Sequence, residues 1–214
     1  MKKRHVTALL VLVVWGGFMP GIFPAAWGSP KIKILFLGDS ITAGYGVAKE
    51  DAYPALLGQK LESLGIHHVE IINGSISGST TASALSRLKW FQKAAPDVLV
   101  LALGANDGLR GLSVENMKEN LGQAIAFAKN NNMDVILAGM QIPPNYGPEY
   151  ADAFKQVFTT LADDHGIALI PFLLEGVGGR SDMNQPDGIH PNRAGHQQIA
   201  KTVLPFILKQ IQEP

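Results

Sequence analysis

Five short, mostly apolar runs are spaced along the chain, and most of them are uninterrupted. Continuous rather than alternating apolar character is typical of strands that are buried on both faces of a parallel sheet. The runs that this pattern predicts as strands are residues 32–37, 69–72, 98–103, 135–138 and 167–170.

Between these runs, apolar residues recur with the 3.6-residue period of amphipathic helices. Pro54 stands near the start of one predicted helix, and Ser113 is placed as the N-cap of the next. Gly166 stands at the C-terminal end of a third helix, where glycine is favoured. A further helix is predicted after Thr81. The four clearest apolar stripes are Leu56, Leu57, Leu61 and Leu64; Val114, Met117, Leu121, Ala124, Ile125 and Ala128; Phe154, Val157, Phe158 and Leu161; and Ile199, Val203, Ile207 and Ile211.

Alternating strands and helices predict an α/β fold, a three-layer α/β/α sandwich around a five-stranded parallel sheet. We find no linker, internal repeat or low-complexity stretch, which indicates a single domain. In such sheets, ligands bind at the carboxyl ends of the strands. Functional side chains are therefore expected in the loops that follow the strands.

Residues 1–28 have the layout of a secretory signal peptide. Basic residues at 2–4 precede 14 uncharged and mostly apolar residues, 6–19, and the segment ends in prolines and small residues. This pattern predicts cleavage near Gly28 and export to the periplasm or the medium. The alternative is an uncleaved membrane anchor, since no further charge occurs before residue 29. Residues 29–214 then form the single domain.

The composition excludes several classes of protein. The chain has no cysteine, which rules out a disulfide scaffold, a thiol enzyme and a cysteine-ligated zinc site. Lys plus Arg and Asp plus Glu both number 18, and this balance disfavours a nucleic-acid binder.

Polar residues gather after the predicted strands. Segments 38–46, 73–78 and 104–108 follow the first three strands, and segment 187–191 follows the fifth along a longer loop. Together they supply a hydroxyl, glycine backbone, a carboxamide and an Asp/His pair to one edge of the sheet. These are the groups that acyl transfer requires.

Each group has a chemical use in ester hydrolysis. Ser40 is the candidate nucleophile, and His190 is the base that takes its proton. Asp187, three residues earlier, is placed to accept from the other ring nitrogen and to fix the tautomer. The backbone N–H groups of Ser40 and Gly78 and the amide of Asn106 are candidate oxyanion donors.

Each of these five residues also has a purely structural interpretation. Ser40 or Asp187 would cap helices, Gly78 and Asn106 would serve turns, and His190 would be a surface loop residue. Neighbouring or isolated residues are interpreted as structural: Asp39 and Asp107 as bonding loop backbone, His196 as solvent-exposed, and Trp90 as packing.

The same blocks resemble the GDSL, or SGNH, family of serine hydrolases. That family has a Ser in a Gly-Asp-Ser block, a Gly and an Asn as oxyanion donors, and an Asp-x-x-His block, in this order. Ser40, Gly78, Asn106, Asp187 and His190 match these positions. The resemblance implies a flavodoxin-like sheet order, 2-1-3-4-5, and neither a metal nor an organic cofactor.

A closer resemblance is to the branch of bacterial exported arylesterases and multifunctional thioesterase/lysophospholipases. Segments 106–111, 141–147 and 187–192 carry it, and it extends over residues 31–211. The main departure is Ile41, because the Gly-Asp-Ser-Leu motif that gives the family its name has Leu at this position. The resemblance implies a serine esterase for acyl or aryl esters, lysophospholipids and acyl thioesters, with no nucleic acid or obligatory protein partner, and a monomer.

The expected acyl-site lining is apolar, which favours these substrates over sugar phosphates. Two alternatives remain open: a carbohydrate O-acetyl esterase on the same fold, and a non-catalytic flavodoxin-like binding module. The residues expected to line the acyl site are Tyr45, Ile76, Leu109, Ile142, Pro143, Tyr146 and Met183.

Overall fold

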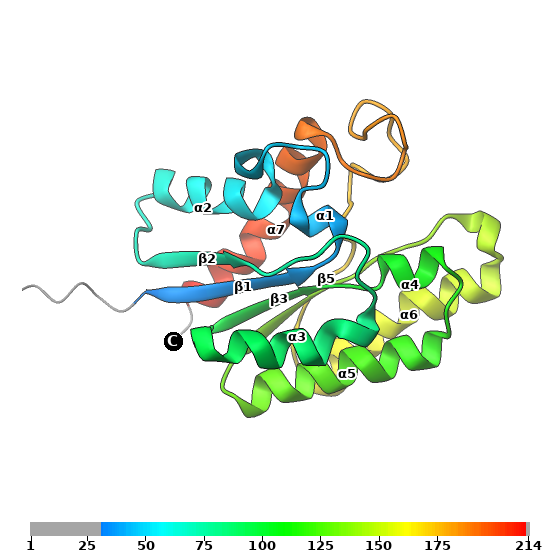
Figure 1. Cartoon of the computed structure of the whole chain (residues 1–214), viewed down its shortest axis with the longest axis horizontal. Coiled ribbons are helices and arrows are strands. Elements are labelled where there is room, and N and C mark those ends of the chain that lie inside the picture. Colours follow the sequence, from blue (N-terminus) through cyan, green and yellow to red (C-terminus); the bar gives the residue numbers. More distant parts are fainter. Residues whose placement is uncertain (1–30, 213–214) are drawn as a thin grey trace, which may run out of the picture.

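A single sheet of five parallel strands forms the centre of the molecule (Figure 1). The computed structural model describes residues 31–212, so the predicted signal peptide lies outside the described residues. The strand order is β2-β1-β3-β4-β5, which confirms the expected topology. The strands are β1 (Ile32–Gly38), β2 (Val69–Asn73), β3 (Val98–Ala102), β4 (Asp134–Ala138) and β5 (Ala168–Ile170).

Helices cover both faces of the sheet, as the three-layer prediction requires. On one face α2 (Tyr53–Ser63) packs against α7 (Arg193–Gln212). On the other face α5 (Val114–Asn130) lies between α3 (Ala84–Phe91) and α6 (Pro148–His165). The shorter helices are α1 (Ser40–Ala43), α4 (Ala105–Leu109), η1 (Lys49–Asp51), η2 (Thr81–Ser83), η3 (Gln92–Ala94) and η4 (Pro144–Tyr146).

The predicted helix signals act as expected. Ser113 caps α5 by accepting a hydrogen bond from the Asn116 N–H at 3.1 Å. Gly166 ends α6 with a φ of 60°, a left-handed conformation that glycine adopts without steric cost. Leu64, in contrast, lies just beyond α2 and is 48% exposed, so its place in the apolar stripe was wrong.

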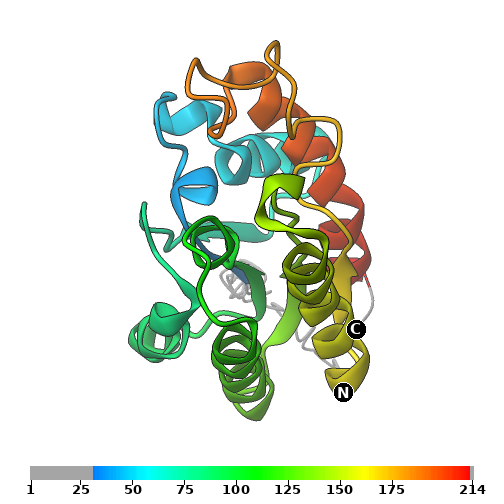
Figure 2. The ribbon, with the colours of Figure 1, turned by 90° about the vertical axis from the view of Figure 1, so that its right-hand side faces the viewer.

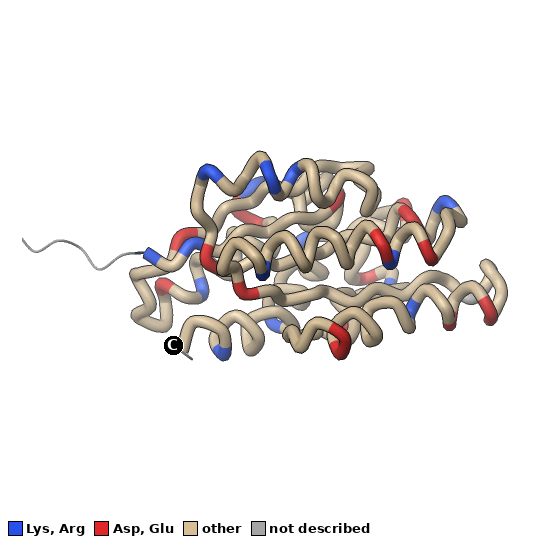
Figure 3. Tube along the Cα trace, turned by 90° about the horizontal axis from the view of Figure 1, so that it is seen from below, with Lys and Arg blue, Asp and Glu red and all other residues tan. Residues whose placement is uncertain are grey.

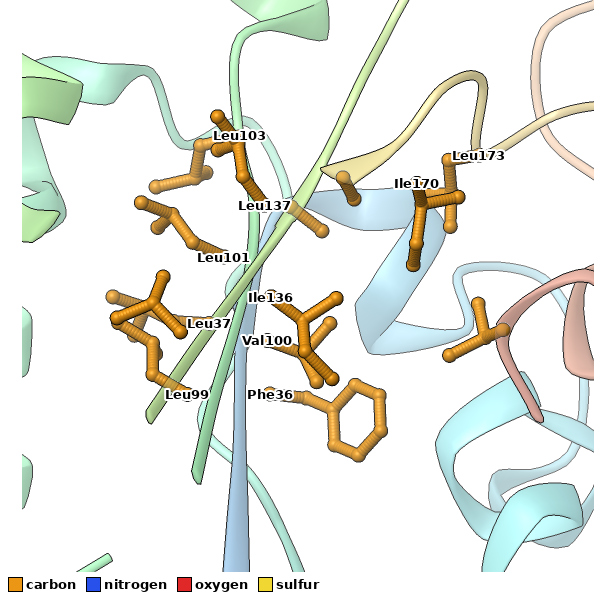
Figure 4. Close-up of a cluster of buried hydrophobic side chains, with 14 of the residues drawn as sticks. Phe36, Leu37, Leu99, Val100, Leu101, Leu103, Ile136, Leu137, Ile170 and Leu173 are labelled. Carbon is orange, nitrogen blue, oxygen red and sulfur yellow. The ribbon is translucent and has the colours of Figure 1, made fainter. Parts of the chain in front are cut away.

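The core forms on both faces of the central strands. Successive residues of a strand point to opposite faces, so Phe36 and Leu37 are both fully buried (Figure 4). Parallel register places Phe36 beside Val100 and Leu37 beside Leu101. Each such side chain contributes about 1.5–3 kcal/mol through burial. A rigid sheet therefore supports the loops at its carboxyl edge.

The expectation for His196 was wrong, and that for Trp90 holds only in part. His196 is fully buried on α7, where its ring stacks on Tyr53 with the centroids 6.4 Å apart. Trp90 packs edge-on against Phe91, with the ring centroids 4.7 Å apart, and the Lys93 ammonium lies 3.8 Å from the Trp90 ring centroid. The Trp90 side chain is nevertheless 60% exposed on α3, so it is not part of the core.

Charged residues of both signs are mixed along the described part of the chain (Figure 3). On the side drawn in Figure 3, Asp and Glu lie among Lys and Arg along the helices. Within residues 31–212, no helix is both long and apolar enough to span a bilayer. The same residues contain no cluster of acidic and histidine side chains arranged to hold a metal ion.

Candidate active site

Ser40 is the first residue of α1, at the point where β1 ends. The side chain of Asp39, not that of Ser40, caps this helix by accepting from the Ile41 N–H at 3.0 Å. The turn is tight, because a Cβ at Gly38 would lie 2.3 Å from the Thr42 hydroxyl oxygen. This turn leaves the Ser40 hydroxyl available at the carboxyl edge of the sheet, which Figure 2 views directly.

Asp187 and His190 lie in the long loop between β5 and α7. One Asp187 oxygen accepts from the backbone N–H groups of Ile189 and His190, each at 2.9 Å. The other oxygen lies 2.7 Å from His190 Nδ1. The cap of α7 is Asn192, which accepts from the Gly195 N–H, so Asp187 does not cap that helix.

The loop brings His190 to Ser40 from 150 residues away. His190 Nε2 lies 2.9 Å from Ser40 Oγ, which completes a hydrogen-bonded chain from Ser40 through His190 to Asp187. The backbone N–H of His190, followed by its side chain and the Ile189 N–H, lowers the pKa of Asp187 to about 2. Asp187 is therefore a carboxylate at neutral pH and can fix the imidazole tautomer.

Hydrogen bonds through Ser79 and Arg110 connect the loop of Gly78 to Asn106. Asn106, in α4, donates from Nδ2 to the Ser79 carbonyl at 3.1 Å. Arg110 Nη2 lies 3.1 Å from the Gly78 carbonyl and 3.4 Å from Asn106 Oδ1. A carboxamide nitrogen carries two hydrogens, so the bond to Ser79 leaves one for a ligand. Gly78 has a φ of 78°, which explains a glycine at this turn.

The two neighbouring aspartates bond loop backbone, as expected. Asp107 is buried and accepts from the Thr81 N–H at 2.9 Å and the Thr81 hydroxyl at 2.6 Å. Asp39 is also buried, and burial raises its pKa to about 6. One Asp39 oxygen has no hydrogen-bond partner within the described part of the chain, a feature that the sequence did not indicate.

Two contacts that hold the His190 loop were missed in the sequence. Gln185 Nε2 donates to the carbonyls of Tyr45, at 2.7 Å, and Pro191, at 3.0 Å. The Tyr45 ring lies 4.7 Å from the His190 ring, centroid to centroid. A lone glutamine in a loop carries no local signal for such a role, because its partner loop is known only from the fold.

An apolar groove of about 390 Å³ adjoins α1 and the His190 loop. Leu109, Ile142 and Pro143 line it as expected. Tyr45 and Ile76 are instead exposed, the Tyr146 hydroxyl bonds the Leu109 carbonyl, and Met183 packs against the core. The apolar lining residues that were not anticipated include Ile41, Met140, Phe172, Leu174 and Ile189.

A parallel α/β sandwich with a Ser–His–Asp chain at the carboxyl edge of its sheet defines the class of serine hydrolases. Residues 36–198 match the model of the GDSL-like lipase/acylhydrolase family, and the chain belongs to this family.

Relatives of known name agree with this class. Esterase TesA of Pseudomonas aeruginosa is 40% identical over 175 residues, which span 81% of this chain and 87% of the relative. An arylesterase of Vibrio mimicus is 38% identical over 84% of this chain and 90% of its own. Thioesterase 1/protease 1/lysophospholipase L1 of Escherichia coli K12 is 37% identical over 84% of this chain and 83% of the relative.

Solved structures give the same result. The crystal structure of TesA superposes with a TM-score of 0.80 at 39% identity, covering 83% of this chain and 99% of that one. The psychrotrophic esterase EstA from Pseudoalteromonas sp., inhibited by monoethylphosphonate, also reaches 0.80 at 35% identity, covering 86% and 100%. The chain is a carboxylic ester hydrolase, and a non-catalytic binding module is set aside.

Proposed function

We propose that the protein hydrolyses acyl esters through a covalent acyl-enzyme on Ser40. The observation that carries this proposal is the hydrogen-bonded chain in which Ser40 Oγ lies 2.9 Å from His190 Nε2 and His190 Nδ1 lies 2.7 Å from Asp187. Both distances are within the reach needed for proton transfer and for orienting the base.

Acylation begins as Ser40 Oγ attacks the ester carbonyl carbon and its proton passes to His190 Nε2. Asp187 remains a carboxylate and stabilises the imidazolium that forms. The proton then passes from His190 to the leaving alcohol or thiol as its bond to the acyl carbon breaks. Water, deprotonated by His190, attacks the acyl-enzyme in the second half, and Ser40 recovers its proton.

The tetrahedral intermediate needs donors for its oxyanion. The backbone N–H groups of Ser40 and Gly78 and the remaining N–H of the Asn106 amide fill this role in the proposal. The bond from Asn106 to the Ser79 carbonyl supports it, because it fixes the amide beside Gly78. Loss of one such donor typically lowers turnover 10²- to 10³-fold.

The apolar groove supports an acyl-chain site. It is lined chiefly by aliphatic and aromatic side chains and reaches Ile41 and Ile189, the neighbours of Ser40 and His190. Aryl esters, lysophospholipids and acyl thioesters are the proposed substrates, and the relatives include an arylesterase and a thioesterase/lysophospholipase. We further propose that residues 1–28 direct export and that residues 29–214 act as a monomer.

Hydrolysis of p-nitrophenyl esters from acetate to palmitate tests this function. The expected result is activity that extends beyond acetate and that Ser40→Ala abolishes. Ser86→Ala is the matched control, because Ser86 is an exposed serine on α3 that donates only to the Ser83 carbonyl. Cleavage confined to acetate would favour the O-acetyl esterase, and activity in Ser40→Ala would contradict the proposal.

A further inference from the structure

Arg87 is a partly buried arginine whose guanidinium reaches the carboxyl ends of β1 and β2. Its Nη1 donates to the Gly38 carbonyl at 3.2 Å and to the Ser79 hydroxyl at 2.9 Å. Its Nη2 donates to the Gly74 carbonyl. One side chain on α3 thus joins the last residue of β1 to the loop that follows the neighbouring strand β2.

Each contacted group lies next to a proposed oxyanion donor or its loop. Gly38 stands two residues before Ser40, and Ser79 directly follows Gly78. The Ser79 carbonyl in turn accepts from the Asn106 amide at 3.1 Å. The relative positions of all three donors therefore depend on the loops that Arg87 joins.

The partners of Arg87 are neutral oxygens. Within residues 31–212 it forms no ion pair, and burial lowers its pKa, an effect that the nearby charge of Asp39 opposes. A partly desolvated charge is costly unless it is hydrogen-bonded. Nη1 and Nη2 have partners, whereas the buried Nε has none within the described residues. The planar guanidinium presents several donors in a fixed fork, whereas a lysine ammonium is a single point of contact. This geometry explains an arginine where the carbonyls of Gly38 and Gly74 must be held at once.

We propose that Arg87 is a positioning residue that sets the geometry of the oxyanion hole by joining the carboxyl end of β1 to the loop after β2. The inference rests on the proposed function. It predicts an effect on the transition state rather than on the binding of substrate, because the oxyanion exists only after attack by Ser40.

The test compares Arg87→Ala and Arg87→Lys in the full protein with p-nitrophenyl butyrate. In Arg87→Ala we expect kcat to fall about 10- to 100-fold with KM within about threefold, since a misplacement of 1 Å can cost about 10²-fold. Arg87→Lys retains the charge but not the fork, so its kcat should lie between wild type and Arg87→Ala. Lys89→Ala is the matched control, because it removes an exposed cation from the same helix.

Chemical rescue separates positioning from stability. Guanidinium at millimolar concentration should restore part of kcat in Arg87→Ala with saturation, and it should leave Lys89→Ala unchanged. Thermal unfolding shows whether each variant is folded at the assay temperature.

Two results would overturn the inference: a folded Arg87→Ala with kcat within twofold of wild type, or a loss expressed only in KM. If Arg87→Ala does not fold, Arg87→Lys takes its place in the test. A kcat within twofold of wild type, or a loss expressed only in KM, would then overturn the inference. Failure of the proposed function is distinct from both, because it would appear as a wild-type protein without esterase activity or a fully active Ser40→Ala.

Discussion

Two buried residues that titrate make opposite contributions to stability near the site. Burial raises the pKa of Asp39 from an ordinary value of 3.8 to about 6. Burial also lowers the pKa of His196 from 6.5 to about 4, against the opposing charge of Asp51. Between pH 4 and 6 the folded protein therefore binds an extra proton at Asp39 and lacks one at His196. The two effects offset each other in the wild-type protein.

Replacing Asp39 should expose the His196 contribution. Because the folded pKa of Asp39 is raised, its contribution to stability is largest below pH 4 and is lost as pH rises to 6. Asp39→Asn keeps a capping oxygen for Ile41 and removes this dependence. We expect its free energy of unfolding, relative to wild type, to increase by about 2–3 kcal/mol between pH 4 and pH 7. Urea unfolding at both values measures this, and a difference independent of pH would contradict it.

Replacing His196 should change the pH dependence of stability in the opposite direction. Its lowered pKa means that stability is present above pH 6.5 and is lost as pH falls through 6.5 towards 4. In His196→Asn the amide oxygen can take the place of Nδ1, which accepts from the Tyr53 N–H at 3.3 Å. As the pH falls from 7 to 4, the free energy of unfolding of the variant should decrease by about 3 kcal/mol less than that of wild type. This difference does not depend on the overall stability of the variant. An unchanged loss over this range, again by urea unfolding, would show that His196 does not titrate in it.

At the scale of elements, Asp107 ties α4 to the loop that carries Gly78. Its carboxylate accepts both the N–H and the hydroxyl of Thr81, and Asn120 on α5 donates to the same hydroxyl at 3.2 Å. Three segments thus meet at the Thr81 hydroxyl, which donates to the buried Asp107 carboxylate and accepts from Asn120. Asp107 directly follows Asn106.

Asp107→Asn should therefore weaken both the fold and catalysis. The amide nitrogen faces a donor, which leaves one buried group unsatisfied at a cost of about 1–3 kcal/mol. We also expect kcat to fall about 10-fold, because α4 carries Asn106. Denaturant unfolding and ester kinetics check the two effects. Ser113→Ala is the control, because it removes the N-cap of α5 and should lower the free energy of unfolding by about 1 kcal/mol. It should leave kcat unchanged.

The elements themselves were predictable because their signals are local. Five apolar runs gave five strands, and the proline, serine and glycine signals lie where the structure uses them. His196 was misassigned although it stands three residues before Ile199 on the buried stripe of α7. Its spacing from Ile199 predicted a buried position, whereas its polar side chain suggested an exposed one. Trp90 shows the reverse, because its type suggested packing while it lies two residues beyond the buried Leu88.

At the scale of the whole molecule, the fold assembles the site from four separate loops. The sequence identified the five candidate groups, and the structure brings Ser40, Asp187 and His190 into one hydrogen-bonded chain and joins Gly78 to Asn106. Their catalytic roles stay a prediction. Gln185 and Arg87 were missed because their partners are carbonyls of distant loops, and a carbonyl has no sequence signature.

The groove makes a prediction about substrate range. Ile142 lines it with its side chain against Gly108 of α4, and a larger side chain there shortens the space for an acyl chain. Ile142→Phe should lower kcat/KM for octanoate and longer esters about 10-fold, the equivalent of about two methylenes at 0.8 kcal/mol each. Acetate should be nearly unaffected, and Ile142→Val should shift the profile little. An equal loss for all chain lengths would place the acyl chain elsewhere.

Capture of the covalent intermediate tests the role of Ser40 most directly. The protein is mixed with p-nitrophenyl butyrate, quenched in acid within the first turnovers, and measured by intact-mass and peptide mass spectrometry. We predict a mass increase of one butyryl group on the peptide that contains Ser40, with none in Ser40→Ala. A butyryl group on another residue, or hydrolysis at full rate in Ser40→Ala, would contradict the acyl-enzyme mechanism.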